Sequence, residues 1–489
     1  MERYQAVIIG GGSAGMTAAS GMASLGAKVA LIEKRDSLGG DCLHFGCVPS
    51  KALIKTANMS HNMYEAADLL GLNISGTLSF EKVKNRINEA RDTIQSHDSS
   101  DRFTDMGADV YFGEASFESD HVINISGETS IYADKVVIAT GSKPVIPPID
   151  GIETIPYVTN ETIFDLPALP SKLGVIGGGT VGLEMAQAFS RLGSEVTVFE
   201  GSGRLFSKED RDIARFMENE MSKELNIELN AKVINADYKN EKSVLTVEQK
   251  DQQSTYEFDV ILVAAGRKPA IDSLQLENAG VEKVKGFIHT DTSFRTSRPH
   301  IFAVGDTINT LPFTHAAGEE AKTVVSNVLF GLKNTLDHSN TPWVTFTVPE
   351  VFHLGMTEQE AEDHNIDYKV YRAHLNEVDR FITAHETRGF VKFITDKKGY
   401  ILGAHAAGTD AGEWMQLAVF AKKNKMKVGT LSRMVYTYPV KAGAVQKSAD
   451  LFWREKLFDG PIPKLTKNFF ELKYKLSNGP RQQEEQNQH

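Results

Sequence analysis

The sequence predicts an α/β fold in which two Rossmann-like units are joined to a further C-terminal domain. Two observations lead to this prediction. A glycine-rich turn between an apolar strand and a helix occurs in residues 5–33 and again in residues 173–200. The chain also has 489 residues, which at about 150 residues per domain corresponds to roughly three domains. We therefore expect a third domain to follow the two units.

Residues 5–33 carry the first unit, QAVIIGGGSAGMTAASGMASLGAKVALIE. An apolar strand leads into Gly10, Gly12 and Gly15 in the spacing GxGxxG, an alanine-rich helix follows, and a second strand ends in Glu33. In such a unit the glycines permit a tight turn, a close approach to a pyrophosphate and close helix–strand packing, and the acid binds a ribose hydroxyl. The complete order of strand, turn, helix, strand and acid predicts a dinucleotide site.

Residues 173–200 repeat this pattern as LGVIGGGTVGLEMAQAFSRLGSEVTVFE. Gly177, Gly179 and Gly182 take the three glycine positions, and Glu200 ends the following strand. Two complete units predict two bound dinucleotides, and a flavin with a nicotinamide is the most economical pair. Two glycine-rich turns without a ligand are the alternative.

Composition and charge narrow the class of protein. Apolar residues make up 41% and charged residues 24% of the chain, which is ordinary for a globular protein. The net charge of −11 argues against nucleic acid as a main partner. The opening MERYQAVIIGGGSAG lacks the features of a signal peptide, and no apolar run approaches the ~18 residues that span a bilayer. We therefore expect a cytoplasmic protein.

Cys42 and Cys47 are the only two cysteines, and both lie in GGDCLHFGCVPSK, residues 39–51. A structural zinc site usually takes four ligands from two clusters, so we expect no metal here. On an ideal helix these two Cα atoms would be about 8.6 Å apart, which is beyond the reach of a disulfide. A redox-active pair therefore requires a bend between the two residues.

The residues around the pair permit such a bend and favour a reactive thiol. Gly39, Gly40 and Gly46 supply conformational freedom, and Pro49 suits the first turn of a helix. A thiol beside a helix N-terminus and a lysine, here Lys51, ionises more easily. The pair is either redox-active or consists of two buried thiols, and the surrounding motifs favour the first interpretation.

Four more motifs join the cysteine stretch: KVVIATGSKP at 135–144, ILVAAGRKP at 261–269, IFAVGDT at 301–307 and PFTHAAGEEAK at 312–322. With these five motifs the chain resembles the class I pyridine nucleotide–disulfide oxidoreductases, which include dihydrolipoamide dehydrogenase, glutathione reductase and mercuric reductase. The resemblance covers about residues 4–455. It implies an FAD-binding and an NAD(P)-binding Rossmann-like domain followed by a C-terminal α+β dimerisation domain.

The resemblance implies cofactor-binding roles for two groups of residues. Those implied for FAD are Gly10, Gly12, Gly15, Glu33, Thr140, Gly141, Gly305, Asp306, Phe313, Thr314, His315 and Ala316. Those implied for the nicotinamide coenzyme are Gly177, Gly179, Gly182, Glu200 and Gly266. An acid such as Glu200 repels the 2′-phosphate of NADPH, and Arg204 compensates only in part, so we expect NADH, with NADPH the less favoured coenzyme.

The resemblance also implies an electron relay. Cys47 is the thiol that contacts the flavin, and Cys42 is the outer thiol that meets the substrate. Lys51 lies near the flavin N5 and pairs with Glu184. Electrons then pass from the nicotinamide to the flavin, to the Cys42–Cys47 disulfide and on to an acceptor.

Two departures from the family pattern concern the acceptor. In VYTYPVKAG, residues 435–443, Tyr438 stands where the family has a proton-moving histidine, and Gly443 stands at the position of its glutamate. A tyrosine, with a reference pKa of about 10, is a poor base at neutral pH. Asp41 and His44 replace a threonine and an asparagine beside the first cysteine. His44 is either a substitute proton carrier or a hydrogen-bonding residue of the FAD cleft.

The motif positions set the expected domain limits. We expect an FAD-binding domain at 1–150 and 273–340, an NAD(P)-binding domain at 151–272, a dimerisation domain at 341–460, and an extension at 461–489 whose last dozen residues are disordered. In the family the dimerisation domain builds a homodimer. Such a dimer would bring Tyr438 to the cysteines of the other subunit. The basic and aromatic segment 464–476 either packs on the dimer or makes peripheral contact with an anionic membrane.

Three classes of function are compatible with these features. The first is a flavin–dithiol reductase for an unidentified small-molecule acceptor such as a disulfide, persulfide, quinone or metal ion, with dihydrolipoamide dehydrogenase proper as one variant. The second is an NADH oxidase or diaphorase. The third is a redox sensor that signals through its thiol state.

Overall fold

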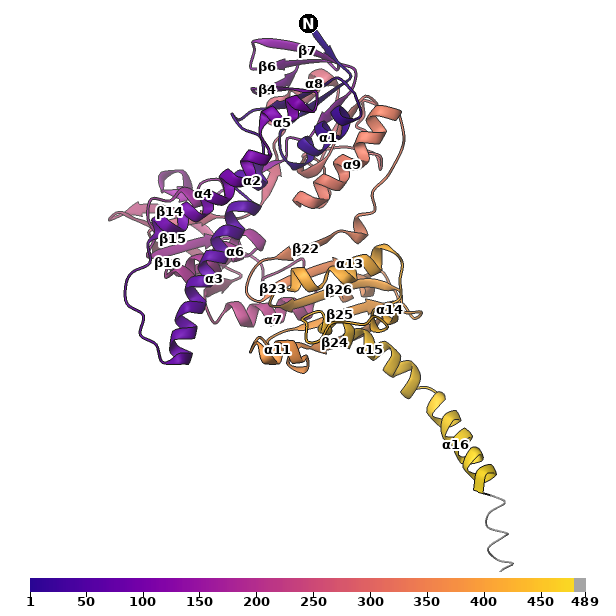
Figure 1. Ribbon diagram of the computed structural model, residues 1–489. Helices are drawn as coiled ribbons and strands as arrows, with labels where there is room; N and C mark the ends of the chain where they lie inside the picture. Colours follow the sequence, from indigo (N-terminus) through magenta and orange to yellow (C-terminus); the bar gives the residue numbers. More distant parts are fainter. Residues whose placement is uncertain (479–489) are drawn as a thin grey trace, which may run out of the picture. The chain divides into compact units, whose positions relative to one another are not determined.

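The computed structural model describes residues 1–478 and has the mixed α/β fold predicted from the sequence (Figure 1). Residues 479–489, for which we predicted disorder, lie outside the described residues. The chain forms two compact units, which are described separately below. Unit 1 comprises residues 1–208, 214–341 and 345–347, and unit 2 comprises residues 209–213, 342–344 and those from 348 onward.

The first parallel sheet of unit 1 has the strand order β21-β8-β2-β3-β4. Its strands are β2 (Ala6–Ile9), β3 (Val29–Glu33), β4 (Ala108–Phe112), β8 (Val136–Ile138) and β21 (Ile301–Ala303). Every residue of β2, β3, β8 and β21 is buried, as expected for strands covered on both faces. Helices α1 (Ser13–Ser24) and α9 (Thr314–Phe330) lie side by side in Figure 1. The strand order reverses at β2, and the crevice at such a point is where α/β sheets bind ligands.

A second parallel sheet repeats this arrangement with the order β10-β17-β11-β12-β13. Its strands are β10 (Tyr157–Val158), β11 (Lys172–Ile176), β12 (Glu195–Glu200), β13 (Asn226–Leu229) and β17 (Val260–Val263). Helix α6 (Thr180–Leu192) connects β11 to β12. An antiparallel sheet follows, formed by β14 (Lys232–Lys239), β15 (Lys242–Gln249) and β16 (Gln252–Phe258).

Smaller elements complete unit 1. A four-stranded sheet of order β1-β7-β6-β5 is formed by β1 (Glu2–Tyr4), β5 (Ala115–Phe117), β6 (Val122–Ile125) and β7 (Thr129–Ala133). Strands β9 (Ser142–Pro144) and β18 (Arg267–Pro269) pair antiparallel. The helices near the cysteines are α2 (Gly40–His44), α3 (Cys47–Leu70), α4 (Phe80–His97) and α5 (Ser100–Asp105), and α3 packs on α4 and α6.

Unit 2 contains one five-stranded sheet of order β22-β23-β26-β25-β24. Its strands are β22 (Pro342–Thr345), β23 (Glu350–Gly355), β24 (Lys369–His374), β25 (Phe390–Thr395) and β26 (Ile401–Gly408). Its larger helices are α10 (Glu358–Asp363), α13 (Gln416–Lys423), α14 (Val428–Ser432) and α15 (Gly443–Phe458). Phe352, Phe393, Trp414 and Phe452 lie in the core between sheet and helices.

Helix α16 (Ile462–Asn478) follows α15 and carries the amphipathic segment predicted from the sequence. Its apolar side chains are largely exposed: the exposed fraction is 64% for Leu465, 60% for Phe469 and 72% for Leu476. Within residues 1–478, none of the helices combines the length and the hydropathy needed to cross a bilayer.

Candidate active site at the cysteine pair

The first glycine-rich turn closes at the end of β2. Gly10 has a φ of 109°, and a Cβ on it would lie 2.4 Å from the carbonyl oxygen of Ala139. A Cβ on Gly15 would lie 1.7 Å from the carbonyl oxygen of Gly10. Oε2 of Glu33 accepts a hydrogen bond of 2.6 Å from the amide of Gly11. Glycine is therefore required twice in this turn, and Glu33 closes it.

The second turn repeats these contacts at the end of β11. Gly177 has a φ of 115°, and a Cβ on it would lie 2.5 Å from the carbonyl oxygen of Ala264. A Cβ on Gly182 would lie 2.0 Å from the carbonyl oxygen of Gly177. Oε2 of Glu200 accepts a hydrogen bond of 2.7 Å from the amide of Gly178. The two glycine-rich turns thus share their geometry as well as their sequence pattern.

Both turns fit a dinucleotide. Helices α1 and α6 begin after Gly12 and Gly179, and neither helix start carries a side-chain cap, so the first-turn amides can bind a pyrophosphate. The hydroxyl of Thr140 is buried without a hydrogen-bond partner among the described residues. Around Gly141 and Gly266 there is open space for 4 Å from an added Cβ. The predicted residues therefore leave both the donors and the room that FAD and a nicotinamide coenzyme need.

Asp306 lies beyond the end of β21, where the short turn Gly305–Thr307 follows the strand. Its Oδ2 accepts a hydrogen bond of 2.5 Å from Oγ of Ser142. Burial raises the pKa of Asp306 above its usual range. A half-shielded carboxylate with one hydroxyl partner suits a polyol such as a ribityl chain.

The predicted segment 313–316 forms the start of α9. The rings of Phe313 and His315 stack with centroids 5.7 Å apart, and Ala316 is buried. Oγ1 of Thr314 lies 3.3 Å from Sγ of Cys47. The N-terminus of α9 therefore meets the N-terminus of α3, where Cys47 is the first residue.

The bend expected between the two cysteines is present. Cys42 belongs to α2 and Cys47 begins α3, so the two thiols lie on separate helices. The segment starts with Gly39 and Gly40, whose φ values are 116° and 59°. A Cβ on Gly40 would lie 2.6 Å from Cα of Gly12, so the cysteine segment packs directly on the first glycine-rich turn.

The two thiols differ in acidity. The hydrogen bond from Cys42 lowers the pKa of Cys47 to about 6, with further help from Thr314 and from the charge of Lys51. The same bond, together with burial, raises the pKa of Cys42. Cys47 is exposed and Cys42 is half-buried. At neutral pH the pair therefore holds one thiolate, at Cys47, and one proton, at Cys42.

The lysine charge near Cys47 is fixed in place. Nζ of Lys51 donates a 2.8 Å hydrogen bond to Oε2 of Glu184, whose side chain is 4% exposed. The other oxygen, Oε1, accepts a bond of 2.8 Å from the amide of Phe346. Nζ also lies 4.5 Å from the centroid of the Phe346 ring. The pairing of Lys51 with Glu184 is thus part of the geometry of unit 1.

Asp41, which stands where the family pattern has a threonine, has a cationic partner. Its Oδ2 lies 3.1 Å from a guanidinium nitrogen of Arg267, and its Oδ1 accepts a bond of 3.4 Å from Asn160. Arg267 also donates to the side chain of Asn160 and to Oγ of Ser142. Sequence reasoning did not find this network, because Asn160 lies 119 residues from Asp41 and no local pattern links them.

His44, which stands where the family pattern has an asparagine, has a partner that fits the hydrogen-bonding alternative. Its Nε2 donates to the carbonyl oxygen of Leu38 at 2.9 Å. Its ring also makes a tilted contact with Phe45, with centroids 5.8 Å apart. The side chain therefore ties α2 to the segment before it.

In unit 2, Tyr438 has a carboxylate partner. Its hydroxyl donates a 2.7 Å hydrogen bond to Oδ2 of Asp379, and this bond raises the pKa of Tyr438 further above that of a useful base. The side chain of Tyr438 is 80% exposed. The sequence contained no signal for Asp379, which lies 59 residues earlier.

A cavity of about 580 Å³ opens beside Cys42. Its walls come from α1, the cysteine helices, α4, α5 and α9. Charged side chains in the walls are Asp98, Arg102 and Lys322, and the apolar ones include Ile94 and Phe103. Cys42 is the cysteine of the pair that lines this cavity, and Cys47 is not among its lining residues.

Comparison with protein families gives two matches. The model described as pyridine nucleotide-disulphide oxidoreductase matches residues 4–321, and the model described as the dimerisation domain of the same family matches residues 341–449. The family uses FAD and pyridine nucleotide coenzymes.

Similar proteins occur in several bacteria. The chain is 31% identical over 457 residues to a mercuric reductase of Staphylococcus aureus, covering 92% of this chain and 82% of that protein. It is 32% identical over 448 residues to the probable pyridine nucleotide-disulfide oxidoreductase RclA of Escherichia coli, covering 90% and 97%. It is 33% identical over 466 residues to a dihydrolipoyl dehydrogenase of Buchnera aphidicola, covering 92% and 95%.

A solved structure is also similar. The Cu(II) complex of the HOCl-induced flavoprotein disulfide reductase RclA from Escherichia coli superposes with a TM-score of 0.83 at 30% identity, covering 92% of this chain and 100% of that one. Sequence, fold and the geometry of the two nucleotide turns agree. The chain belongs to the pyridine nucleotide-disulphide oxidoreductase family.

Proposed function

We propose that the protein is an NADH-dependent reductase that passes electrons through FAD and the Cys42–Cys47 pair to a thiol-binding metal ion. The observation that carries this proposal is the asymmetry of the pair. Cys47 has a lowered pKa and contacts Thr314, whereas Cys42 lines the cavity of about 580 Å³. FAD, when bound, supplies two-electron transfer between a nicotinamide and a disulfide.

The residues account for the protons of the first half-reaction. Opening the disulfide takes two electrons and, at neutral pH, one proton. With a pKa of about 6, Cys47 stays unprotonated in most molecules at pH 7, and the proton goes to Cys42. Lys51, held by Glu184, keeps a positive charge near the Cys47 thiolate.

The second half-reaction favours a metal ion over a disulfide. Exchange with a disulfide needs a base that takes the proton from Cys42, and Tyr438 is unsuited to this because its pKa is raised. A metal ion displaces a thiol proton directly, since a coordinated thiol is deprotonated. Oxidation of the pair, one thiolate and one thiol, back to the disulfide then releases two electrons and one proton, which reduces two Cu(II) to Cu(I) or one Hg(II) to Hg(0). Relatives named mercuric reductase and a relative crystallised with Cu(II) support this class of acceptor.

An anaerobic acceptor screen tests the proposal. The holoenzyme is reduced with NADH and mixed with Cu(II), Hg(II), lipoamide, oxidised glutathione or a quinone, and flavin reoxidation is followed. We expect the metal ions to react at least tenfold faster than lipoamide, and Cys42→Ser to abolish that reaction. Lipoamide as the fastest acceptor would establish a dihydrolipoamide dehydrogenase. Turnover that survives Cys42→Ser would indicate a diaphorase, and no turnover at all would indicate a sensor.

The preference for NADH follows from the second glycine-rich turn. Both oxygens of Glu200 accept hydrogen bonds of 2.7 Å from backbone amides, those of Gly178 and Ser202, so its charge is fixed beside the second glycine-rich turn. The guanidinium of Arg204 donates to the carbonyl of Ser207, so one of its nitrogens is already engaged. A higher kcat/KM for NADPH than for NADH would contradict this assignment.

We also propose a homodimer, supported by the match to a dimerisation domain over residues 341–449. Within it, α16 packs on the dimer through the face formed by Leu465, Phe469, Leu472 and Leu476, which recur at helical spacing and are exposed in the single chain. Co-sedimentation with anionic liposomes, with and without residues 461–489, separates this from membrane contact. A pellet fraction that falls on truncation would favour the membrane.

A further inference from the structure

Three groups of side chains in residues 1–478 bring together donor atoms of the kind that bind metal ions. One of them lies in unit 1 and is formed by Asp120, His121 and His300, and the other two lie in unit 2. They differ in whether their donor atoms are already engaged.

The buried group of Glu209, His353 and His405 is largely satisfied. The two oxygens of Glu209 accept hydrogen bonds of 2.7 Å from Nε1 of Trp343 and 2.8 Å from Nδ1 of His353. Nε2 of His353 donates to the carbonyl of Gly355 at 2.9 Å. Both nitrogens of His353 and both carboxylate oxygens are therefore in use, and this group is a structural network.

The acidic group of Asp210, Asp212 and Glu358 already contains a cation. The fully buried ammonium of Lys392 contacts all three carboxylates, at 2.5 Å from Asp210 and 3.1 Å from Asp212. A metal ion would have to displace this ammonium. The group therefore provides a site for Lys392 and not for a metal.

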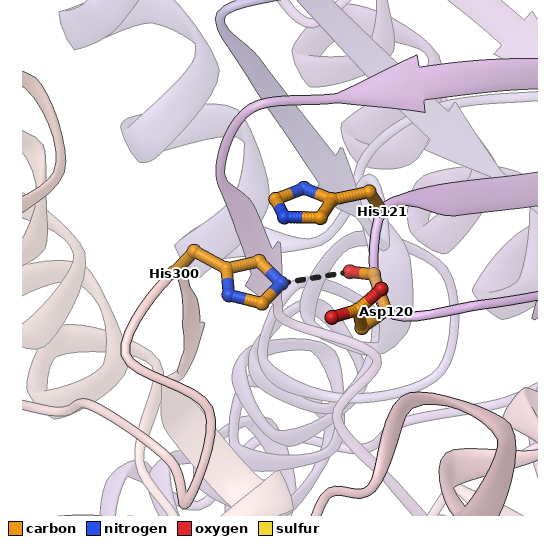
Figure 2. Close-up of side chains that lie close together, drawn as sticks. All are labelled: Asp120, His121 and His300. Atoms are coloured by element: carbon orange, nitrogen blue, oxygen red, sulfur yellow. Dashed lines mark hydrogen bonds between the residues drawn. The ribbon is translucent and has the colours of Figure 1, made fainter.

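In the group of unit 1, each histidine keeps one ring nitrogen free for a metal ion, and the carboxylate of Asp120 is free as well. Nδ1 of His121 donates to the carbonyl of Ala133 at 2.7 Å, and Nε2 of His300 donates to the carbonyl of Asp120 at 2.9 Å (Figure 2). A carbonyl oxygen can only accept, so these two nitrogens carry the protons. The second nitrogen of each ring keeps its lone pair, and neither these nitrogens nor the Asp120 carboxylate has a hydrogen-bond partner among the described residues. An N–H that donates to a backbone carbonyl is also the usual orienting contact of a metal-binding histidine.

The backbone holds both histidines in place. Asp120 and His121 come from the turn between β5 and β6, and His300 directly precedes β21. The amide of Ala133 donates to the carbonyl of His121, and the amide of Val136 donates to the carbonyl of His300. The two rings lie face to face, with centroids 4.0 Å apart and planes inclined by 16°, as Figure 2 shows. The stack keeps the two rings close together, and because the free lone pair of each ring lies in its ring plane, the rings have to turn out of the stack for one ion to bind both nitrogens.

From this geometry we propose that Asp120, His121 and His300 form a binding site for a divalent transition-metal ion of the Zn(II) class. One ring nitrogen from each histidine and one carboxylate oxygen lie within 4.8 Å of one another. Donors that share an ion with bonds of about 2.1 Å are at most about 4.2 Å apart, so the donor atoms have to approach by less than about 1 Å while the two rings turn out of their stack. Two imidazoles and one carboxylate match the ligands that zinc accepts, with a fourth position left for water.

The bound ion would join two segments that are distant in sequence. It would tie the β5–β6 turn to the start of β21, the strand that leads to Gly305 and Asp306. An ion that binds the folded protein only also stabilises it, by an amount that grows with ion concentration. The site is separate from the thiols and does not depend on the proposed acceptor reaction.

Zinc binding by the holoenzyme tests this proposal. The background is Cys42→Ser/Cys47→Ser loaded with FAD, because thiolates would bind Zn(II) themselves. Equilibrium dialysis should find one Zn(II) per chain in this background and at least tenfold weaker binding after His121→Ala/His300→Ala. The matched control, His289→Ala/His364→Ala, removes two exposed histidines elsewhere and should bind as the background does.

A second measurement guards against a folding defect. Zn(II) should raise the Tm of the background but not that of the His121→Ala/His300→Ala variant. If that variant fails to retain FAD, Zn(II) binding is measured instead in the single variants His121→Gln and His300→Gln. Each of them should bind Zn(II) at least tenfold more weakly than the background. Equal Zn(II) stoichiometry and affinity with and without the two histidines would overturn the proposal.

Discussion

Replacing Cys42 by alanine should raise the pKa of Cys47. The hydrogen bond from Cys42 is the largest cause of the lowered Cys47 pKa, which is about 6. A hydrogen bond to a charged group contributes about 1.5–3 kcal/mol, which corresponds to roughly one to two pKa units. The pKa of Cys47 should therefore move to about 7–8, and the thiolate fraction at pH 7 should fall from roughly 90% to about 10–50%.

Absorbance spectroscopy measures this shift, because a thiolate beside oxidised FAD gives a long-wavelength absorbance band. The band is recorded between pH 4 and pH 10 in the FAD-loaded Cys42→Ala and Cys42→Ser variants. Serine keeps a hydroxyl donor at the same position, so Cys42→Ser is the matched control and its midpoint should stay near pH 6. The variants cannot form the disulfide, so no reductant is needed.

Two results would refute the reasoning. One is an identical midpoint in the alanine and serine variants, which would mean that the bond from Cys42 does not set the acidity of Cys47. The other is a midpoint above pH 8 in Cys42→Ser, which would mean that Thr314 and Lys51 do not stabilise the thiolate. Loss of FAD in either variant is checked from the flavin absorbance per chain.

Three other changes have expected outcomes. Arg267→Ala leaves Asp41 without its cationic partner and should lower the free energy of unfolding by about 1–3 kcal/mol, with Arg267→Lys restoring only part of it. Urea titrations followed by flavin fluorescence measure this, and an unchanged unfolding midpoint would contradict it. Gly182→Ala places a Cβ 2.0 Å from a carbonyl oxygen and should raise the KM for NADH at least tenfold while FAD stays bound, whereas Gly15→Ala should instead lower the FAD content; equal effects on both cofactors would argue against two separate sites. His44→Ala should leave the rate of thiol reoxidation unchanged from pH 6 to 8, because the His44 side chain is hydrogen-bonded to the Leu38 carbonyl. A reoxidation rate that loses its pH dependence in this variant would identify His44 as a proton carrier.

The parts of this molecule that the sequence predicted are those built by neighbouring residues. A glycine-rich turn needs its glycines within six residues and its acid at the end of the next strand, so Gly10 to Glu33 and Gly177 to Glu200 could be located before any coordinates. The bend at the cysteines followed from the reach of a disulfide. The basic and aromatic segment 464–476 was recognised from neighbouring residues in the same way, and the structure shows that it is a helix, α16.

The parts that could not be predicted depend on contacts between distant segments. Asp379 meets Tyr438 only because α11 (Asp379–Thr383) and the 435–438 segment come together in unit 2. His300 stacks on His121, although it lies 180 residues after Asp120, because β21, the strand that directly follows His300, pairs with β8. Such pairs have no spacing rule, because the fold brings them together.

The backbone contact between Gly40 and Gly12 constrains how this protein can change. With no side chain between them, the thiol-bearing segment and the pyrophosphate turn behave as a single rigid piece, and a mutation in one displaces the other. The cavity walls at Ile94 and Phe103 come from other helices, α4 and α5. Substitutions there can change the shape and polarity of the cavity without altering either glycine.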